Sequence, residues 1–484
     1  MRITKISIKD FRAFRGAPTV IDLTVEGHNL LVYGENGSGK SSLFQALNLF
    51  FSPLINAPKF EDNKNIYVTT NDGHIKLDIG DDTSSPTYEW EEAAIPFKEK
   101  IVSDASKTKG FLDYRSLLET HFIQRYSKDV DIFSLTVNTL LANFLNPIKK
   151  IPFKTQFANI KSLVAKRRSK YRDIELKDNL DSFNAGLIST LNELSKKSNE
   201  ILALFEHSTS ISFLVPGKGI YEHAYYKQLE NQAIYLKVSY NGKEITGHHH
   251  FLNESRLSAV AISIYLAALL LTPPSQLRVI FLDDVLIGFD MSNRLPLLNI
   301  LSTHFSDWQI FLTTYDRVWF EMVRFRVKDW NSKWAYAEFY CGKSDEGDIP
   351  IYVKEWRDYL GIAREHLDAN DLKAAAIYIR SAYEDCLKHF ADKQNLHIRY
   401  CVNPKDQKAD YFWLVVSKAQ LKTGGSVLDA ALIAEVELYR SAILNQLSHT
   451  APVTFVRREV EDSLNTINKL QAKLDTVPKS AVAN

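Results

Sequence analysis

The sequence predicts an α/β domain that carries a short helical arm and is followed by an all-α domain. Three observations predict this fold class. The apolar run Asn29–Tyr33 is typical of a buried strand, and a glycine-rich loop and helical apolar spacing follow it. Residues 154–207 form a polar-rich helical stretch, which indicates an inserted arm. From about Glu355 onward the pattern is almost entirely helical, so we expect domains at 1–345 and 346–484.

Composition narrows the functional classes. The chain has 484 residues, of which 45% are hydrophobic and 24% charged, as in ordinary soluble proteins. No apolar run is long enough to span a membrane. The three cysteines show no metal-ligand spacing and indicate a reducing, cytoplasmic environment: Cys341, Cys386 and Cys401. A formal charge of +1 gives no global attraction for nucleic acid, so any such surface must be local.

A cluster of basic residues and a run of three histidines could each be structural or could bind a ligand. Residues 166–170, Lys-Arg-Arg-Ser-Lys, together with Arg172, lie on the predicted arm. A solvated helix face is the default, and phosphate tracking along DNA or RNA is the alternative. The three histidines 248–250 are expected to form a polar loop, because three adjacent residues cannot all face one metal ion.

Residues 34–41 match the phosphate-binding pattern G-x-x-x-x-G-K-[ST]. Its glycines let backbone N–H groups converge on phosphate oxygens, and the following helix N-terminus adds positive charge. Lys40 would reach the β- and γ-phosphates, and the Ser41 hydroxyl would ligate Mg²⁺. The sequence therefore predicts ATP and Mg²⁺ as cofactors, bound by these residues: Asn36, Gly37, Gly39, Lys40, Ser41 and Ser42. The simpler alternative is a glycine-rich turn before an ordinary helix.

A second apolar run, Val279–Leu282, ends in two carboxylates. A buried strand that ends in Asp283 places this carboxylate beside the phosphate loop, where it can help to hold Mg²⁺. Asp284 would then orient the attacking water as a catalytic base. The alternative is a strand that ends in an acidic turn.

Several segments resemble the ATP-binding-cassette (ABC) heads of the RecF, SMC and Rad50 type. They are Phe11–Phe14, His121–Gln124, Leu252–Arg256, Gly288–Asp290 and Thr313–Asp316. The resemblance covers about residues 1–345 and implies an ABC-type ATPase head. It implies that Arg12 approaches the phosphates and that Gln124 senses both Mg²⁺ and the attacking water. It also implies that two heads sandwich two nucleotides, with Asn253 or Ser255 contacting the γ-phosphate held by the other copy.

The chain departs from that family at three positions. The segment Leu252–Arg256 lacks the two glycines of the family signature, and Asp284 stands where the family has glutamate. Tyr315 replaces the family's switch histidine; it can donate a hydrogen bond but cannot carry a proton at neutral pH. We therefore expect a head that hydrolyses ATP slowly and stays closed for long periods.

The helical C-terminal part contains a possible second site. Arg380 and Glu384 lie four residues apart and share a helix face, and Asn445 and His449 follow with the same spacing. The arrangement resembles the HEPN-type domains of the PrrC and RloC anticodon nucleases. That resemblance implies a ribonuclease in which His449 is the general acid–base and Arg380 steadies the phosphate. The plain alternative is a polar network that holds a helix bundle together.

The whole layout resembles the PtuA family, the ATPases of the Septu antiphage systems that also occur beside some retrons. In that family the ATPase oligomerises and carries a separate HNH nuclease, PtuB. The sequence itself contains no H-N-H or Toprim-like cluster. Our interpretation is an oligomeric regulator of a partner nuclease that meets nucleic acid, DNA or tRNA, through the complex. The alternatives are an ATPase-gated ribonuclease and a DNA-repair head of the RecF kind.

Overall fold

The computed structural model describes residues 1–484 except 55–56, 82–84, 92–94, 121–129, 206–207, 290, 331, 345–346, 355–358, 402–406, 441–455 and 484. It divides into two compact units, Met1–Glu355 and Trp356–Asn484. The predicted boundary at residue 345 lies between two antiparallel strands, whose pairing keeps the second strand in the first unit. The predicted fold class is confirmed: an α/β unit with a helical arm precedes an all-α unit.

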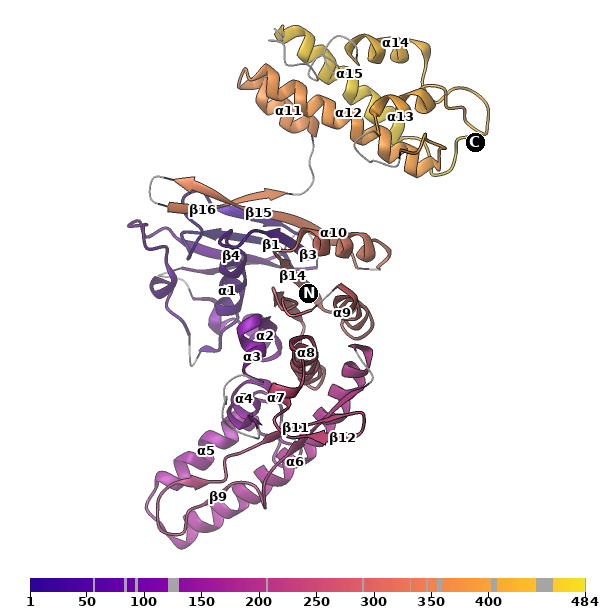
Figure 1. Ribbon diagram of the computed structural model, residues 1–484. Helices are drawn as coiled ribbons and strands as arrows, with labels where there is room; N and C mark the ends of the chain where they lie inside the picture. The colour runs from indigo at the N-terminus through magenta and orange to yellow at the C-terminus, as the bar shows by residue number, and fades with distance from the viewer. Residues whose placement is uncertain are drawn as a thin grey trace. The chain divides into compact units, whose positions relative to one another are not determined.

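A six-stranded sheet forms the centre of the first unit (Figure 1). Its strands follow the order β16 (Gly347–Lys354), β15 (Trp334–Ser344), β3 (Asn29–Gly34), β14 (Gln309–Thr314), β13 (Val279–Asp283) and β6 (Gly110–Asp113). All neighbours are parallel except the antiparallel pair β15 and β16. Every residue of β13 and β14 is buried, as expected for parallel strands covered on both faces. The carboxyl ends of β3, β14 and β13 therefore lie at the same edge.

One core joins this sheet to a second, antiparallel sheet and to α1 (Lys40–Phe50). The second sheet has the order β2 (Thr19–Asp22), β1 (Arg2–Lys9), β4 (His74–Gly80) and β5 (Thr87–Trp90). Phe281 of β13 and Phe311 of β14 belong to this core and pack against each other. Because side chains alternate along a strand, their neighbours Ile280 and Ile310 belong to the core on the opposite face.

That opposite face is covered by helices. They are α8 (Glu254–Leu270), α9 (Met291–His304) and α10 (Arg317–Arg326). In α8 every residue from Leu257 to Ala268 is buried except Tyr265, which explains why its sequence is apolar all round. The unit's other helices are α2 (Lys100–Thr108), α3 (Tyr114–Leu118), α4 (Phe133–Leu135), α7 (His248–Phe251), and the short turns η2 (Glu61–Asn63), η3 (Pro96–Lys98), η4 (Thr136–Leu140) and η5 (Val327–Asp329).

The predicted arm consists of α5 (Phe153–Ala165) and α6 (Lys170–Phe205), which pack side by side (Figure 1). Ring contacts among Phe153, Phe157 and Phe183 join the two helices. Short strands accompany the arm: β7 (Val130–Asp131), β8 (Thr209–Leu214), β9 (Tyr221–Glu222), β10 (Leu229–Glu230), β11 (Tyr235–Tyr240) and β12 (Lys243–Ile245). Of these, β9 and β10 form a separate hairpin.

The second unit is a helix bundle with its own core. Its helices are α11 (Tyr359–Asp368), α12 (Leu372–Gln394), α13 (Ala409–Val416), α14 (Ala430–Tyr439) and α15 (Arg457–Asp475). Asp371 begins α12 by accepting a hydrogen bond from the Ala374 N–H, and Asn395 ends it in a left-handed conformation. Within the described ranges, no helix combines the length and apolarity needed to cross a membrane.

Candidate nucleotide-binding site

The phosphate loop connects β3 to α1 and depends on glycine at several positions. Gly37 and Gly39 have φ angles of 85° and 99°, a region that other residues rarely occupy. A Cβ atom on Gly34 would lie 2.5 Å from the Ser38 hydroxyl oxygen, and one on Gly39 would lie 2.8 Å from Pro350. Backbone conformation therefore requires glycine at positions 37 and 39, and the lack of space requires it at positions 34 and 39.

The antiparallel pair β15 and β16 packs against this loop. Cys341 and Pro350 are register partners in the pair. The Cys341 thiol donates to the Asn36 carbonyl at 3.5 Å, and Pro350 lies against Gly39. Sequence analysis did not find these two contacts, because both residues lie about 300 positions from the loop and belong to no motif.

Lys40 is the cation of the site. Its ammonium donates to the carbonyls of Gly34 at 2.7 Å and Glu35 at 3.1 Å, and it lies 3.5 Å from an oxygen of Asp284. Only 5% of the residue is exposed. This geometry holds a positive charge at the first residue of α1, where the helix N-terminus also favours anions.

Asp283 and Asp284 follow each other at the end of β13 but have different partners. Asp283 accepts a hydrogen bond from the Thr313 hydroxyl at 2.5 Å, across the register pair formed with β14. Asp284, at a positive φ of 49°, accepts from the Tyr315 N–H at 3.0 Å and faces Lys40. The positive φ turns the chain directly after the strand, which separates the two carboxylates.

Burial raises the pKa of both carboxyl groups. For Asp283, the hydroxyls of Thr313 and Ser41 act against this rise, whereas the charge of Asp284 adds to it. For Asp284, the nearby Lys40 ammonium acts against the rise. A buried carboxylate with a raised pKa gains from a cation, because the cation stabilises its charged form.

The side chains and backbone groups at this site fit Mg²⁺ and a nucleoside triphosphate. Mg²⁺ prefers oxygen ligands, which Asp283 and the Ser41 hydroxyl could supply. Lys40 and the backbone N–H groups of the loop could bind the phosphates. Asp284, which lies 3.5 Å from the Lys40 ammonium, could accept a hydrogen bond from a water near the terminal phosphate.

The segment after β1 lies beside the start of α1. The Ala13 N–H lies 3.4 Å from the Ser42 hydroxyl oxygen, to which it donates. Arg12 has a positive φ of 49°, an exposed side chain, and a carbonyl that accepts from the Asn65 amide at 2.6 Å. The structure therefore brings the Arg12 segment next to the phosphate loop.

The N-terminus of α8 begins at an exposed cap residue. The Asn253 side chain caps α8 by accepting from the Arg256 N–H at 3.0 Å, and the residue is exposed. Ser255 in the first turn is partly exposed. Among the residues that the structure describes, neither side chain forms a hydrogen bond with residues 34–42. Glu254 lies against Gly288 and accepts from Tyr114, so the helix start borders the segment that follows β13.

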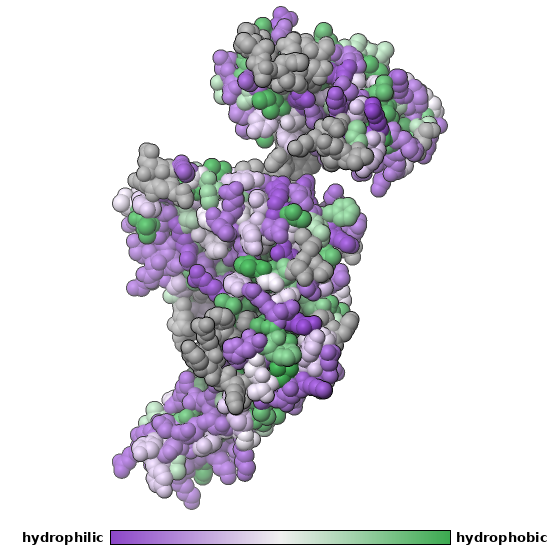
Figure 2. Space-filling model, viewed as in Figure 1, coloured by the Kyte–Doolittle hydropathy of each residue, from purple (hydrophilic) through white to green (hydrophobic). Residues whose placement is uncertain are grey.

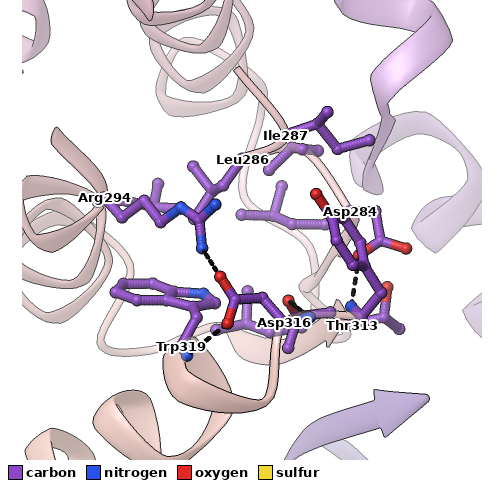
Figure 3. A pocket seen from close by; sticks show the side chains of 13 residues that line it. Asp284, Leu286, Ile287, Arg294, Thr313, Asp316 and Trp319 are labelled. Atoms are coloured by element: carbon purple, nitrogen blue, oxygen red, sulfur yellow. Dashed lines mark hydrogen bonds and ion pairs between the residues drawn. The ribbon is translucent and has the colours of Figure 1, made fainter. Parts of the chain in front are cut away.

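The segment Thr313–Asp316 is held at both ends (Figure 3). Asp316 caps α10 through the Val318 and Trp319 N–H groups and pairs with Arg294. A small cavity of about 20 Å³ lies between this pair and Asp284, large enough for about one water.

Tyr315 contacts Asp284 through its backbone N–H, and the residue is 41% exposed. No sequence motif marks Arg294, so the sequence alone did not predict its place in the site.

Several residues singled out from the sequence lie outside the described residues. They are Gln124, Asp290, Asn445 and His449. The Arg380 Nε atom lies 3.0 Å from a Glu384 oxygen, and each side chain is about one-third exposed. The three histidines predicted as a polar loop form the one-turn helix α7 instead, with His248 buried.

Replacing Asp283 with asparagine is expected to stabilise the nucleotide-free protein while removing its response to Mg²⁺. Because the folded pKa lies above the usual 3.8, the carboxyl group favours folding below this value. That contribution is lost as the pH rises through the folded pKa. Asparagine is neutral and can still accept from Thr313. At pH 7, scanning fluorimetry should show a rise in Tm.

The Tm difference between Asp283→Asn and the natural chain should shrink as the pH falls through the raised pKa of the folded chain, because the natural carboxyl group then becomes protonated. Mg²⁺ should raise the Tm of the natural chain but not that of the variant, since metal binding requires the carboxylate. Asp62→Asn, at an exposed position, is the control. A lower Tm for Asp283→Asn at pH 7 would contradict this account.

Comparisons with known proteins identify the family of the chain. A family model described as AAA ATPase domain matches residues 1–247, just over half of the chain. Similar solved structures include the Smc head domain of Pyrococcus furiosus with an extended coiled coil, bound to the C-terminal domain of ScpA. It shows 11% identity and a TM-score of 0.42, covering 76% of this chain and 99% of that chain. The SMC head domain from Thermotoga maritima shows 12% identity and a TM-score of 0.33, covering 73% and 99%. No curated protein matches the chain. The chain belongs to the AAA ATPase domain family and is an ATPase.

Proposed function

We propose that this chain is the ATP-binding and ATP-hydrolysing regulatory subunit of an antiphage defence complex. In this proposal, two heads close on ATP and control a partner HNH nuclease. One observation carries the assembly part. Lys40, Asp283 and Asp284 converge at one edge of the sheet. The capped start of α8, with Asn253 exposed, forms no hydrogen bond with that edge in the described part of the chain.

A helix N-terminus attracts anions because its first N–H groups have no partner within the helix. The start of α8 is therefore suited to a γ-phosphate, which a second copy would deliver. ATP then lies within the contact between two heads, and assembly depends on nucleotide through ordinary linkage. Slow hydrolysis would prolong the closed state.

The defence role rests on the layout of the chain. A compact head, a short arm and a helical C-terminal part resemble the PtuA family. The sequence lacks an H-N-H cluster of its own, so cleavage would belong to a partner. The helix bundle of the second unit, with its separate core, would serve assembly or nuclease docking. The nuclease partnership can be tested by co-expressing this chain with an H-N-H protein encoded next to it. DNA and RNA cleavage by the purified complex would then be measured with and without ATP.

Variants at Asn253 test the assembly. Asn253→Asp should keep the helix cap, since aspartate is an equally good N-cap residue, but it adds a negative charge that repels the γ-phosphate. Asn253→Ser keeps the cap without adding charge and is the matched control. In sedimentation velocity with Mg·ATP, the natural chain and Asn253→Ser should associate. Asn253→Asp should bind ATP but stay in its nucleotide-free state of association.

Association that is unchanged by ATP, or that survives in Asn253→Asp, would count against the nucleotide sandwich. Either outcome would still be compatible with ATP binding by a single chain. The experiment therefore tests the assembly of two heads separately from ATP binding.

A ribonuclease gated by the ATPase is the second candidate. The observation that favours it is the exposure of the Arg380–Glu384 pair, which leaves the guanidinium accessible to a phosphate. RNA cleavage by the purified chain that is lost in His449→Ala, while ATP binding survives, would support this candidate over a separate nuclease. Absence of RNA cleavage under all nucleotide conditions would remove it.

A further inference from the structure

The end of the arm, where residues 166–169 connect α5 to α6, holds the hairpin β9–β10 through Arg172. The Arg172 guanidinium forms two parallel bonds with Glu222 of β9, at 2.6 and 2.7 Å. It also donates to the Leu163 carbonyl of α5 at 2.8 Å. Arg172 is 4% exposed. A buried, bidentate pair of this kind fixes the geometry of both partners, so the hairpin is attached firmly to the two helices.

A second set of contacts fixes the tip of the hairpin. The Arg168 guanidinium donates to the carbonyls of His223 at 2.9 Å and Ala224 at 2.6 Å. Nδ1 of the His223 ring accepts from the N–H groups of Tyr225 at 3.1 Å and Tyr226 at 3.0 Å. The backbone that carries these two tyrosines is therefore held in place, although the side chains are exposed.

The exposed rings define what we call the arm-tip patch. Its aromatic members are Tyr171 (80% exposed), Tyr225 (88%) and Tyr226 (64%). Its cationic members, all exposed, are Lys166, Arg167 and Lys170. Large aromatic rings at this level of exposure, gathered at one end of an element, mark an interaction surface more often than scattered single residues do.

The charge of the patch is strongly positive in a chain that is nearly neutral overall. The segment Lys161–Arg172 contains six basic residues and no acidic residue, whereas the whole chain has a formal charge of +1. The nearby carboxylates of Glu222 and Asp173 are already paired with Arg172. Within the described part of the chain, the three cationic members of the patch form no ion pair. Figure 2 shows a mostly hydrophilic surface on the visible face of this end of the arm.

We propose that the arm-tip patch binds single-stranded nucleic acid. Basic side chains would contact successive phosphates, and the exposed tyrosine rings would stack on unpaired bases. The bases of a duplex are stacked on each other, so their faces are not accessible to the tyrosine rings. A duplex would therefore contact only the cationic members of the patch. This inference goes beyond the proposed function because it assigns nucleic-acid contact to this chain and to a surface outside the ATP site.

Binding can be measured by fluorescence anisotropy with a labelled thymidine oligonucleotide of about 20 nucleotides and a duplex of the same length. The full chain without nucleotide should bind the single strand more tightly than the duplex. The double variant Tyr225→Ala/Tyr226→Ala should bind it at least about tenfold more weakly, since stacking contributes about 1–3 kcal/mol per base. Tyr225→Phe/Tyr226→Phe keeps the rings and should bind as the natural chain does. Tyr400→Ala, an exposed tyrosine of the second unit, is the control.

The cationic part is tested by salt dependence. Arg167→Gln/Lys170→Gln should make the negative slope of log K against log salt less steep by about 1.4, or about 0.7 for each lost phosphate contact on a single strand. Lys196→Gln, exposed on the same helix and 26 residues from Lys170, should leave the slope unchanged. Equal affinity for the duplex, or full binding by the double alanine variant, would overturn the proposal. So would a double alanine variant whose only change is weaker self-association, because the patch would then be a contact between copies of this chain.

Discussion

Replacing Lys40 with methionine is expected to abolish measurable ATP binding. Methionine keeps most of the aliphatic stem, which packs close to Gly34, but removes the ammonium. Two charge-assisted hydrogen bonds to phosphate contribute about 1.5–3 kcal/mol each. Their loss should weaken binding at least about 100-fold, because 1.4 kcal/mol corresponds to a factor of ten. Titration calorimetry with ATP in the presence of Mg²⁺ measures this change.

The same variant should alter the neighbouring carboxyl group. Lys40 is the positive charge that opposes the raised pKa of Asp284, so its removal should raise that pKa further. The nucleotide-free variant should therefore take up a proton at higher pH than the natural chain does. Lys59→Met, at an exposed position after α1, is the control for loss of a lysine charge. ATP affinity within tenfold of the natural chain would show that Lys40 does not hold the phosphates.

Replacing Asp284 with asparagine is expected to lower kcat at least about 100-fold while ATP binding is retained. A positioned general base typically contributes 10²–10⁴-fold, and asparagine cannot accept a proton from water. Asparagine can still accept the hydrogen bond from the Tyr315 N–H, so the turn after β13 should persist. Phosphate release under saturating ATP measures kcat, and calorimetry measures binding.

Asp284→Glu distinguishes a short base from one with no catalytic role. Its extra methylene group lengthens the reach of the carboxylate, whose oxygen lies 3.5 Å from the Lys40 ammonium in the natural chain. If the natural chain turns over slowly because its base is short, Asp284→Glu should be faster. We expect the natural chain to stay well below the enzyme median of about 10 per second. Natural-chain turnover at that median would contradict slow hydrolysis, and unchanged turnover in Asp284→Asn would refute the role of Asp284 as the base.

The sequence alone determined the parts of this protein whose signals are local. The phosphate loop is contiguous, and Gly37 and Gly39 are required by their own φ angles. The run Val279–Asp283 reads as a buried strand because every residue but the last is apolar, and the structure buries all five. The arm and the helical second unit follow from periodicity over many residues. These features are recognisable because their physical causes lie within one segment.

The tertiary structure decided how distant segments meet. Thr313 reaches Asp283 only because β14 lies beside β13 in a defined register. Pro350 contacts Gly39 because the last strand of the sheet folds back on β15. The attachment of the hairpin tip to the arm likewise depends on Arg172 meeting Glu222, 50 residues away. Such pairings leave no periodic trace in the sequence, because they depend on which surfaces become neighbours when the cores are buried.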